Sequence, residues 1–232
     1  KTAVNPAGDI IGRRAAKELR PDDIVNIGIG IPENVARYAR ESGMLDRITL
    51  TVESGGVGGF PASGTVFGAM IGAASMNDMA NQFDLYDNGG LDICFMGALE
   101  VDRFGNVNSH RGPGAFSGIG GFANITAKTH TVVFCLTFNT KGLDVAENGD
   151  SVEIIKNGSI PKFVDKIDNI SFSAKRAHVN GQRVLYITER CVFELSENGL
   201  RLTQVYDGVD VKKDILELLP FEVEIDGSID AK

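Results

Sequence analysis

A single carboxylate, Glu53, stands between an apolar stretch and a glycine-rich stretch of this chain. Residues 48–52 are apolar or β-branched, which indicates a buried strand that ends just before Glu53. Four of the five residues 55–59 are glycine, and glycine lets a ligand approach the backbone and leaves amides facing it. A strand end of this kind is where an α/β protein would place a reacting group. The alternative is a solvated loop acid followed by an ordinary turn, and this stretch alone leaves both interpretations open.

Two further glycine clusters accompany the first. Residues 26–32 pass from a predicted strand into a helix that begins at Pro32, and free amides and the helix dipole favour anions at such a junction. Residues 112–122 form the other cluster, whose GIGG segment at 118–121 could line a pocket with amides. A tight turn or a flexible loop would explain each cluster separately. Because two of the three clusters follow predicted strands, they favour one shared pocket.

A dinucleotide-binding site is a weaker alternative for the same residues. Glu53 lies near the position of a ribose-binding acid relative to Gly28 and Gly30. However, the third glycine of the GxGxxG pattern is replaced by Glu33, whose carboxylate would oppose a pyrophosphate. The pattern therefore disfavours a dinucleotide oxidoreductase.

The elements that must position Glu53 alternate between strands and helices. Residues 24–29, 32–40 and 48–52 form a strand, a helix and a strand, which predicts a βαβ unit with parallel strands. Helices are predicted at 9–20, 122–127, 171–180 and 211–219, and strands at 92–96, 131–137, 152–155, 184–187, 192–195 and 200–205. The prediction is one α/β domain over residues 1–232. It has an open, mostly parallel or mixed sheet flanked by helices and a β-rich last third.

Composition excludes several classes of function. The net charge of −8 disfavours nucleic acid, whose binding depends on Lys and Arg that neutralise phosphates. Three cysteines without CxxC spacing and three scattered histidines predict no disulfide framework and no metal site. No apolar run reaches the length of a membrane span, and no signal peptide opens the chain. We therefore expect a cytoplasmic protein without a membrane partner.

Short motifs spread along nearly the whole chain resemble the C-terminal, β-type half of family I coenzyme A (CoA) transferases, closest to the acetate/propionate CoA-transferase group. The motifs are VNIGIGIP at 25–32, LTVESG at 50–55, QFD at 82–84, RFGNVN at 103–108, GIGGF at 118–122, VVFC at 132–135, TER at 188–190 and DVKKDIL at 210–216. This resemblance implies a CoA-transferase fold. It also implies a ping-pong transfer of CoA between a short-chain acyl-CoA and a free carboxylic acid.

The resemblance implies that Glu53 is the nucleophile and carries a glutamyl-CoA thioester during the reaction. The candidate groups for oxyanion stabilisation and CoA contact are Gly28, Ile29, Gly30, Ile31, Gly118, Gly120 and Gly121. Lys141 is a further candidate, for a CoA phosphate, although a solvated loop lysine explains it better. Acyl-CoA is then a substrate, and no permanently bound cofactor is expected. Family members pair this half with an α-type subunit or domain, so we expect such a partner and an oligomer.

Two acidic loops imitate the catalytic motif. Some family branches carry their glutamate in a Ser-Glu-Asn-Gly motif, which this chain has at 196–199. The segment ENGD at 147–150 contains the same Glu-Asn-Gly sequence. Each Asn-Gly pair predicts a hairpin turn, and neither glutamate has a glycine cluster behind it. An acyl-CoA hydrolase on the same scaffold and a non-catalytic ligand-binding domain remain alternatives. The sequence does not identify the acid that is used.

Overall fold

A computed structural model describes residues 6–62, 66, 68–112, 115, 116, 118–149 and 151–230, with only the backbone at 115 and 116. Its centre is five parallel strands within a ten-stranded sheet. In spatial order these are β18 (Arg183–Ile187), β12 (Thr131–Cys135), β7 (Ile93–Gly97), β1 (Ile24–Ile27) and β2 (Thr49–Thr51). The structure thereby confirms the predicted α/β fold with an open, mostly parallel sheet.

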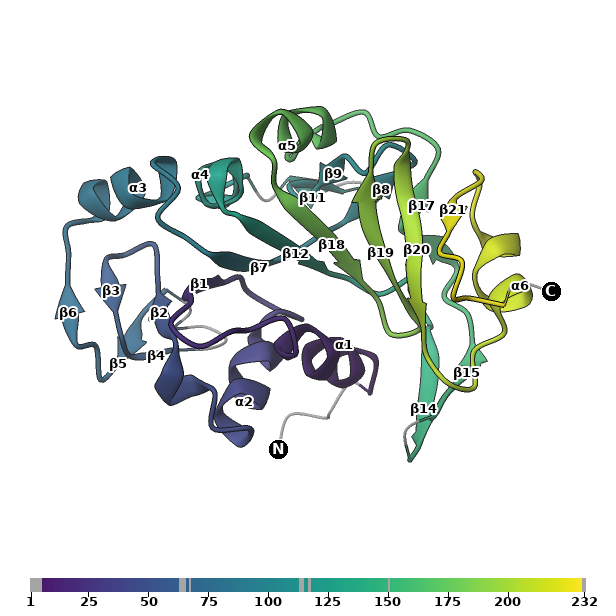
Figure 1. Cartoon of the computed structure of the whole chain (residues 1–232), viewed down its shortest axis with the longest axis horizontal. Coiled ribbons are helices and arrows are strands. Elements are labelled where there is room, and N and C mark those ends of the chain that lie inside the picture. The colour runs from purple at the N-terminus through teal and green to yellow at the C-terminus, as the bar shows by residue number, and fades with distance from the viewer. Residues whose placement is uncertain are drawn as a thin grey trace.

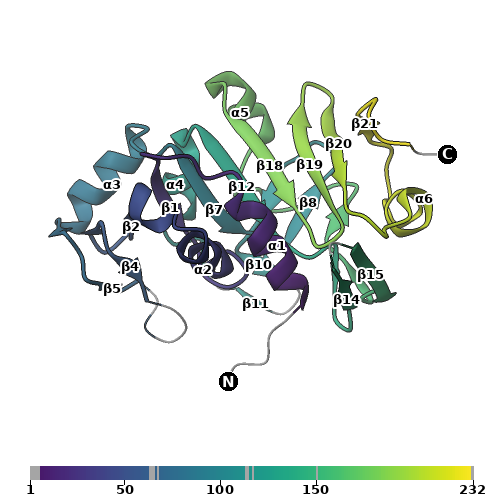
Figure 2. The same ribbon diagram turned by 60° about the horizontal axis from the view of Figure 1, so that its bottom comes forward.

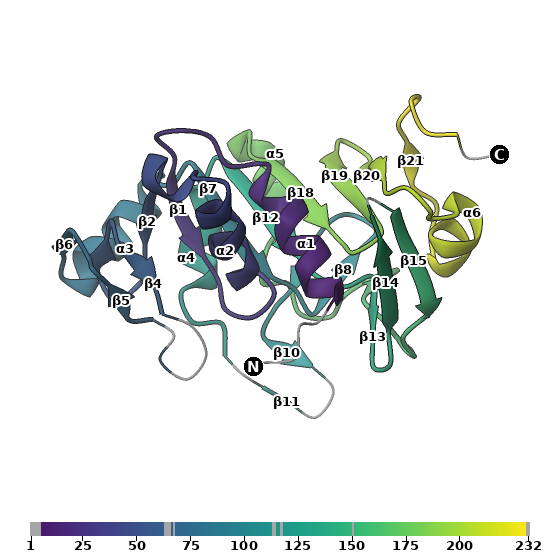
Figure 3. The same cartoon turned by 90° about the horizontal axis from the view of Figure 1, so that it is seen from below.

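Helices cover both faces of this sheet (Figure 1). Helices α1 (Pro6–Ala16) and α2 (Glu33–Glu41) pack on one face, which Figure 3 views from below. Helices α3 (Met79–Asp87), α4 (Phe122–Lys128) and α5 (Ala174–Asn180) lie on the other face. Because successive side chains of a strand alternate between faces, Phe95 and Val133 enter the core under α1 and α2. Their neighbours Cys94 and Phe134 enter the core under α3 and α4.

Antiparallel strands extend both edges of the sheet. Strands β3 (Gly56–Val57) and β6 (Ser75–Met76) continue from β2. Strands β19 (Cys191–Ser196) and β20 (Gly199–Val205) follow β18, and β21 (Glu224–Ile225) closes that edge parallel to β20. This second edge is the expected β-rich last third.

Short ribbons surround the sheet. They are β4 (Phe60–Pro61) with β5 (Met70–Ile71), β8 (Glu100–Asp102) with β9 (Val107–Asn108) and β17 (Phe163–Val164), β10 (Arg111–Gly112) with β11 (Ala115–Phe116), β13 (Asn139–Thr140) with β16 (Ile160–Pro161), and β14 (Asp144–Asn148) with β15 (Ser151–Lys156). The β14–β15 hairpin lies near α6 (Val211–Asp214) in Figures 2 and 3, and β14 contacts α1. Short 3₁₀ turns occupy Leu45–Arg47 and Leu216–Leu218.

Two helices differ from the sequence prediction. Helix α3 was not predicted, although Asp78 caps it by accepting a hydrogen bond from the Ala80 amide. The predicted helix at 211–219 is broken at Ile215 into α6 and a 3₁₀ turn. In the part of the chain that the structure describes, no helix has both the length and the apolar character that crossing a membrane requires.

Candidate active site

A cavity of about 480 Å³ opens at the carboxyl ends of the parallel strands. Gly28 follows β1, Glu53 follows β2, and Gly97 and Cys135 end β7 and β12, and all four line the cavity. The chain runs from β1 to β2 on one side and then returns to β7 on the other side of β1. Ligands of open α/β sheets bind at such a switch point. The sheet topology therefore places Glu53 where ligand chemistry is expected.

A tight turn holds Glu53 between β2 and β3. The Gly55 amide donates to the Val52 carbonyl at 3.0 Å, and the Val52 amide donates to the Gly56 carbonyl at 3.0 Å. Gly55 has a φ of +103°, and a Cβ atom there would lie 2.0 Å from the Asn77 carbonyl oxygen. Only glycine combines this backbone angle with this approach. The turn thus fixes the backbone on both sides of the carboxylate.

Buried polar side chains anchor the strand that leads into the turn. The Thr51 hydroxyl donates to the Val25 carbonyl at 3.0 Å and accepts from the Tyr86 hydroxyl at 3.1 Å. The Asn26 amide donates to the Thr51 carbonyl at 3.3 Å. Because all of these groups are buried, breaking one contact would leave a polar group without a partner. The end of β2 is therefore held rigidly against β1.

The half-buried Glu53 carboxylate lies against Gly121, the residue before α4. A Cβ atom at position 121 would lie 2.5 Å from Glu53 Oε2 and 2.6 Å from Cδ. Burial raises the pKa of Glu53 above its ordinary value, and a hydrogen bond from the Gly121 amide acts in the opposite direction. An amide in this position can also stabilise an oxyanion that forms on this carboxyl group.

The cavity gathers most of the residues that the sequence singled out. Glu53 shares it with Gly28, Ile29, Ile31, Gly118, Gly120 and Gly121. The residues other than Glu53 come from the glycine clusters at 26–32 and 112–122, which are far apart in the sequence. The roles of their amides stay predictions.

Three of the candidate CoA contacts, Gly28, Gly30 and Lys141, stay predictions, and their surroundings differ from those of the others. The Gly28 amide donates to the Phe95 carbonyl at 2.8 Å, and the Gly30 amide donates to the Glu33 carboxylate at 2.7 Å. Both amides are therefore engaged within the protein, which leaves Ile29 and Ile31 as the candidates of this cluster. Gly30 and Lys141 are not among the described residues that line the cavity, and Lys141 sits on an exposed turn with a φ of +62°.

The glycines that follow Glu53 have a different role from the one expected. A Cβ atom on Gly56 would lie 2.8 Å from Met70 Cβ, and one on Gly59 would lie 2.5 Å from the Ile71 carbonyl oxygen. These glycines let residues 70–77 pack against the hairpin, and they do not line the described cavity. The prediction of a ligand cradle at 55–59 was wrong because close backbone packing also requires glycine.

Lys162 is the one charged residue of the described lining that the sequence pattern did not indicate. It lies between β16 and β17 and lines the cavity of Glu53. Burial lowers the pKa of Lys162 to about 8, with Glu189 acting in the opposite direction. No motif marks this lysine, because the fold brings it to Glu53 across more than a hundred residues of sequence. The sequence analysis also did not predict three apolar lining residues, Met96, Ala98 and Leu99. Their position at the end of a predicted parallel strand could have indicated them.

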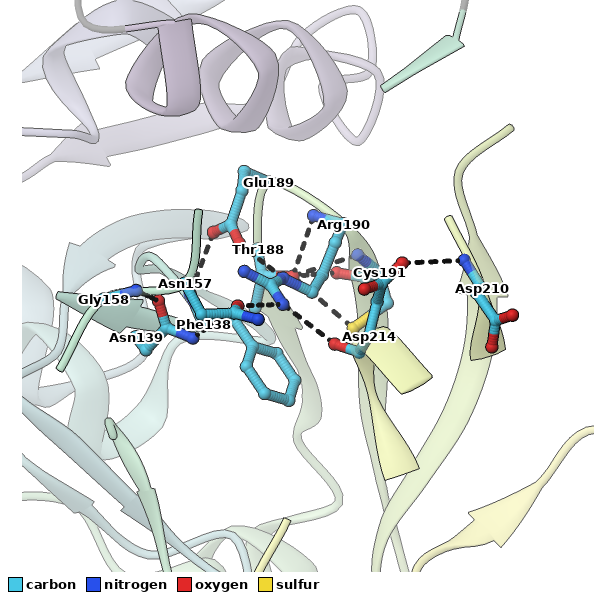
Figure 4. Close-up of polar contacts among 10 residues, drawn as sticks. All are labelled: Phe138, Asn139, Asn157, Gly158, Thr188, Glu189, Arg190, Cys191, Asp210 and Asp214. Carbon is cyan, nitrogen blue, oxygen red and sulfur yellow. Dashed lines mark hydrogen bonds and ion pairs between the residues drawn. The ribbon is translucent and has the colours of Figure 1, made fainter. Parts of the chain in front are cut away.

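A buried ion pair supports the wall that carries Lys162 (Figure 4). Glu189 Oε1 accepts from Arg190 Nε at 2.6 Å, and Glu189 Oε2 accepts from the Phe138 amide at 2.8 Å. Arg190 also donates to Asn157 Oδ1 at 2.9 Å and to the Asp214 carbonyl at 2.8 Å. The pair thus ties the turn between β18 and β19 to three other segments.

The two acidic loops that imitate the motif are hairpin turns, as predicted. Ser196 pairs with Gly199 at the end of the β19–β20 hairpin, and Glu197 is exposed there. Asn148 pairs with Ser151 at the end of the β14–β15 hairpin, and position 150 lies outside the described residues. Neither Glu147 nor Glu197 lines the cavity of Glu53.

A model of the coenzyme A transferase family matches residues 9–137. The chain belongs to the coenzyme A transferase family. It is 32% identical over 213 residues to the acetate CoA-transferase subunit beta of Escherichia coli K12, covering 87% of this chain and 86% of that subunit. The chain therefore corresponds to the β-type half of a family I CoA-transferase.

Longer relatives contain the same half. The chain is 40% identical over 212 residues to the acetate CoA-transferase YdiF of Escherichia coli K12, covering 91% of this chain and 40% of that protein. It is 40% identical over 225 residues to the caffeate CoA-transferase of Acetobacterium woodii, covering 95% of this chain and 43% of that protein. The chain thus spans less than half the length of these two relatives.

Solved structures agree with the fold. The YdiF apoenzyme of Escherichia coli O157:H7 superposes with a TM-score of 0.91 at 36% identity, over 100% of this chain and 45% of that one. A YdiF thioester complex with CoA matches equally well, with a TM-score of 0.91. Glutaconate CoA-transferase from Acidaminococcus fermentans has a TM-score of 0.72 at 17% identity, over 99% of this chain and 92% of that one, and shares the fold alone.

Proposed function

We propose that this CoA-transferase half transfers CoA between a short-chain acyl-CoA and a free carboxylic acid, with Glu53 as the nucleophile. The observation that carries the proposal is the position of Glu53. A rigid turn presents its carboxylate to a cavity at the carboxyl ends of parallel strands, against the Gly121 amide. Membership of the CoA-transferase family supports the same reaction.

The reaction divides into steps that a carboxylate can catalyse. Ionised Glu53 attacks the acyl-CoA carbonyl, and the carbon–sulfur bond breaks to give a mixed anhydride and CoA thiolate. The thiolate then attacks the Glu53 carbonyl carbon, so that a glutamyl-CoA thioester forms and the first acid leaves as a carboxylate. An incoming carboxylate reverses these steps. Each tetrahedral intermediate bears an oxyanion, for which the amides of Gly121 and Ile29 are our candidates.

We propose that an α-type half, in the same chain or in a partner subunit, completes the site and takes part in an oligomer. Three apolar residues of the cavity are partly or largely solvent-exposed in this half: Ile29 at 58%, Leu99 at 38% and Ile119 at 39%. Exposed apolar side chains gathered around a site mark a contact surface. Covering them would also exclude water, which would otherwise hydrolyse the glutamyl thioester. A cytoplasmic location fits the three free, buried cysteines.

Mass spectrometry of the complete transferase, with both halves present, tests the proposal. After incubation with acetyl-CoA and rapid digestion, we expect a CoA adduct on the Glu53 peptide. Glu53→Gln should abolish both the adduct and the transfer, whereas the matched variant Glu197→Gln in the exposed hairpin should retain both. Transfer without modification of Glu53 would refute the nucleophile. Release of free CoA without any carboxylate acceptor would indicate a hydrolase, and binding without turnover would indicate a ligand-binding domain.

A further inference from the structure

Lys162 shares the cavity of Glu53 without a direct partner of its own. Within the described residues, its side chain makes no hydrogen bond or ion pair. Its main chain, in contrast, is fixed on both sides. The Lys162 amide donates to the Phe138 carbonyl at 3.3 Å, and the Lys162 carbonyl accepts from the Val101 amide at 2.8 Å. The main chain of Lys162 is therefore held at a defined place in the wall, and its ammonium group is not engaged by the described residues.

The charges around the cavity leave this ammonium group available to a ligand. Among the described lining residues, only Glu53 and Lys162 carry a formal charge at neutral pH. Glu189 lies close enough to influence Lys162, but its carboxylate already accepts from Arg190 and from the Phe138 amide. When Glu53 carries CoA as a neutral thioester, Lys162 remains as the cation of the cavity. The next substrate to enter at that stage is a carboxylate anion.

This inference rests on the proposed function. We propose that Lys162 binds the reacting carboxylate of the acid substrate and positions it for attack on the glutamyl thioester of Glu53. The other walls are suited to the rest of the molecule, since Ile29, Met96 and Leu99 present apolar surface for a hydrocarbon chain. The described wall has no second cation that could hold another carboxylate. This half of the site therefore supplies a binding group for one carboxylate.

The pH dependence of acid binding follows from the same groups. Burial lowers the pKa of Lys162 to about 8, so the ammonium form, which binds a carboxylate, is lost as the pH rises through that value. The titratable and charged groups that share its cavity or act on it are Glu53 from the β2–β3 turn, the Cys135 thiol from β12, and Glu189, which is paired with Arg190. Burial raises the pKa of the Cys135 thiol, which keeps it neutral in this range. The KM for the acid should therefore increase above pH 8, while the KM for acyl-CoA stays flat.

Steady-state kinetics of the complete transferase with acetyl-CoA and butyrate test Lys162. A charge-assisted hydrogen bond to a carboxylate predicts that Lys162→Met raises the KM for butyrate about 10- to 100-fold. The KM for acetyl-CoA and the formation of the Glu53 adduct should stay near wild type. Lys162→Arg should recover part of the butyrate affinity, and the exposed control Lys166→Met should change nothing.

The results that would contradict the role of Lys162 differ from the result that would contradict the proposed function. An unchanged butyrate KM in Lys162→Met overturns the proposal, and so does an increase confined to the acetyl-CoA KM, which would indicate a CoA contact. If Lys162→Met does not fold, the wild-type pH profile decides, and a butyrate KM that is flat through pH 8 refutes the assignment. Absence of the Glu53 adduct in the wild-type enzyme would instead refute the proposed function itself.

Discussion

Replacing Gly121 by alanine should displace the Glu53 carboxylate with little effect on the fold. Gly121 has a φ of −75° and a ψ of −1°, which alanine adopts without strain. The added Cβ would lie 2.5 Å from Glu53 Oε2 and 2.6 Å from Cδ. Because the nearest atoms all belong to the Glu53 carboxyl group, that group must move, by roughly 1 Å, to restore an ordinary contact of at least 3.4 Å.

This displacement sets the size of the effect. A misplacement of about 1 Å in a reacting group costs on the order of 10²-fold in rate, which corresponds to about 2.7 kcal/mol in the activation barrier. The free energy of unfolding should change by less than about 1 kcal/mol. Alanine is a weaker helix cap than glycine, which lowers the free energy of unfolding. It also reduces the entropy of the unfolded chain, which raises the free energy of unfolding by a similar amount.

Gly97→Ala is the matched control, because it adds the same methyl group to the same cavity. Gly97 also lines the cavity, and the nearest atom to its added Cβ would be the Ile29 carbonyl oxygen at an ordinary 3.9 Å. The assay compares kcat/KM for CoA transfer and the rate of Glu53 adduct formation in both variants, with thermal unfolding measured in parallel. A wild-type rate in Gly121→Ala, or an equal loss in Gly97→Ala, would show that the contact between Gly121 and Glu53 does not govern catalysis.

Three further predictions concern the turn, the buried pair and pH. Gly55→Ala should lower the free energy of unfolding by about 3 kcal/mol or more, since strain and overpacking against Asn77 each cost ~1–3 kcal/mol; chemical denaturation measures this loss. Arg190→Met should cost about 3–5 kcal/mol by leaving Glu189 buried without its partner, and adding Glu189→Gln should restore part of that stability in the same assay. Because burial raises the pKa of Glu53 in the folded state, ionisation of Glu53 opposes folding at neutral pH. Glu53→Gln should therefore be more stable than wild type at neutral pH, and thermal unfolding should show the advantage vanish below the pKa of the free glutamate side chain.

The parallel centre of the sheet was predictable because its strands are buried on both faces. Residues 24–52 combine two apolar runs with a helix between them, and short connections allow only one simple arrangement. Helix α3 was not predictable in the same way. Its sequence, MANQFDLYD, buries Gln82 and Tyr86 in place of a regular apolar stripe. Tyr86 donates to Thr51 at the end of β2, and Gln82 accepts from Asn77, so tertiary contacts override the local pattern.

Within the site, the sequence predicted the place of Glu53 better than its surroundings. Glu53 stands out because it follows an apolar run, and Gly121 because it belongs to the GIGG cluster at 118–121. The glycines at 55–59 were misassigned because glycine serves both ligand contact and close packing, and only the position of residues 70–77 separates the two. Lys162 gave no signal, since a lysine between two short strands is ordinary on a surface and becomes informative only once its burial is known.

The separation of Glu53 from Lys162 suits the proposed reaction in two halves. The structure records no ion pair between them, although they line one cavity and carry opposite charges. A direct ion pair would stabilise the Glu53 carboxylate and make it a weaker nucleophile, and it would occupy the ammonium group as well. Held apart by the β2–β3 turn on one side and the β16–β17 connection on the other, both groups stay available. In the proposed mechanism, Glu53 then reacts with the thioester, and Lys162 receives the carboxylate that the reaction releases.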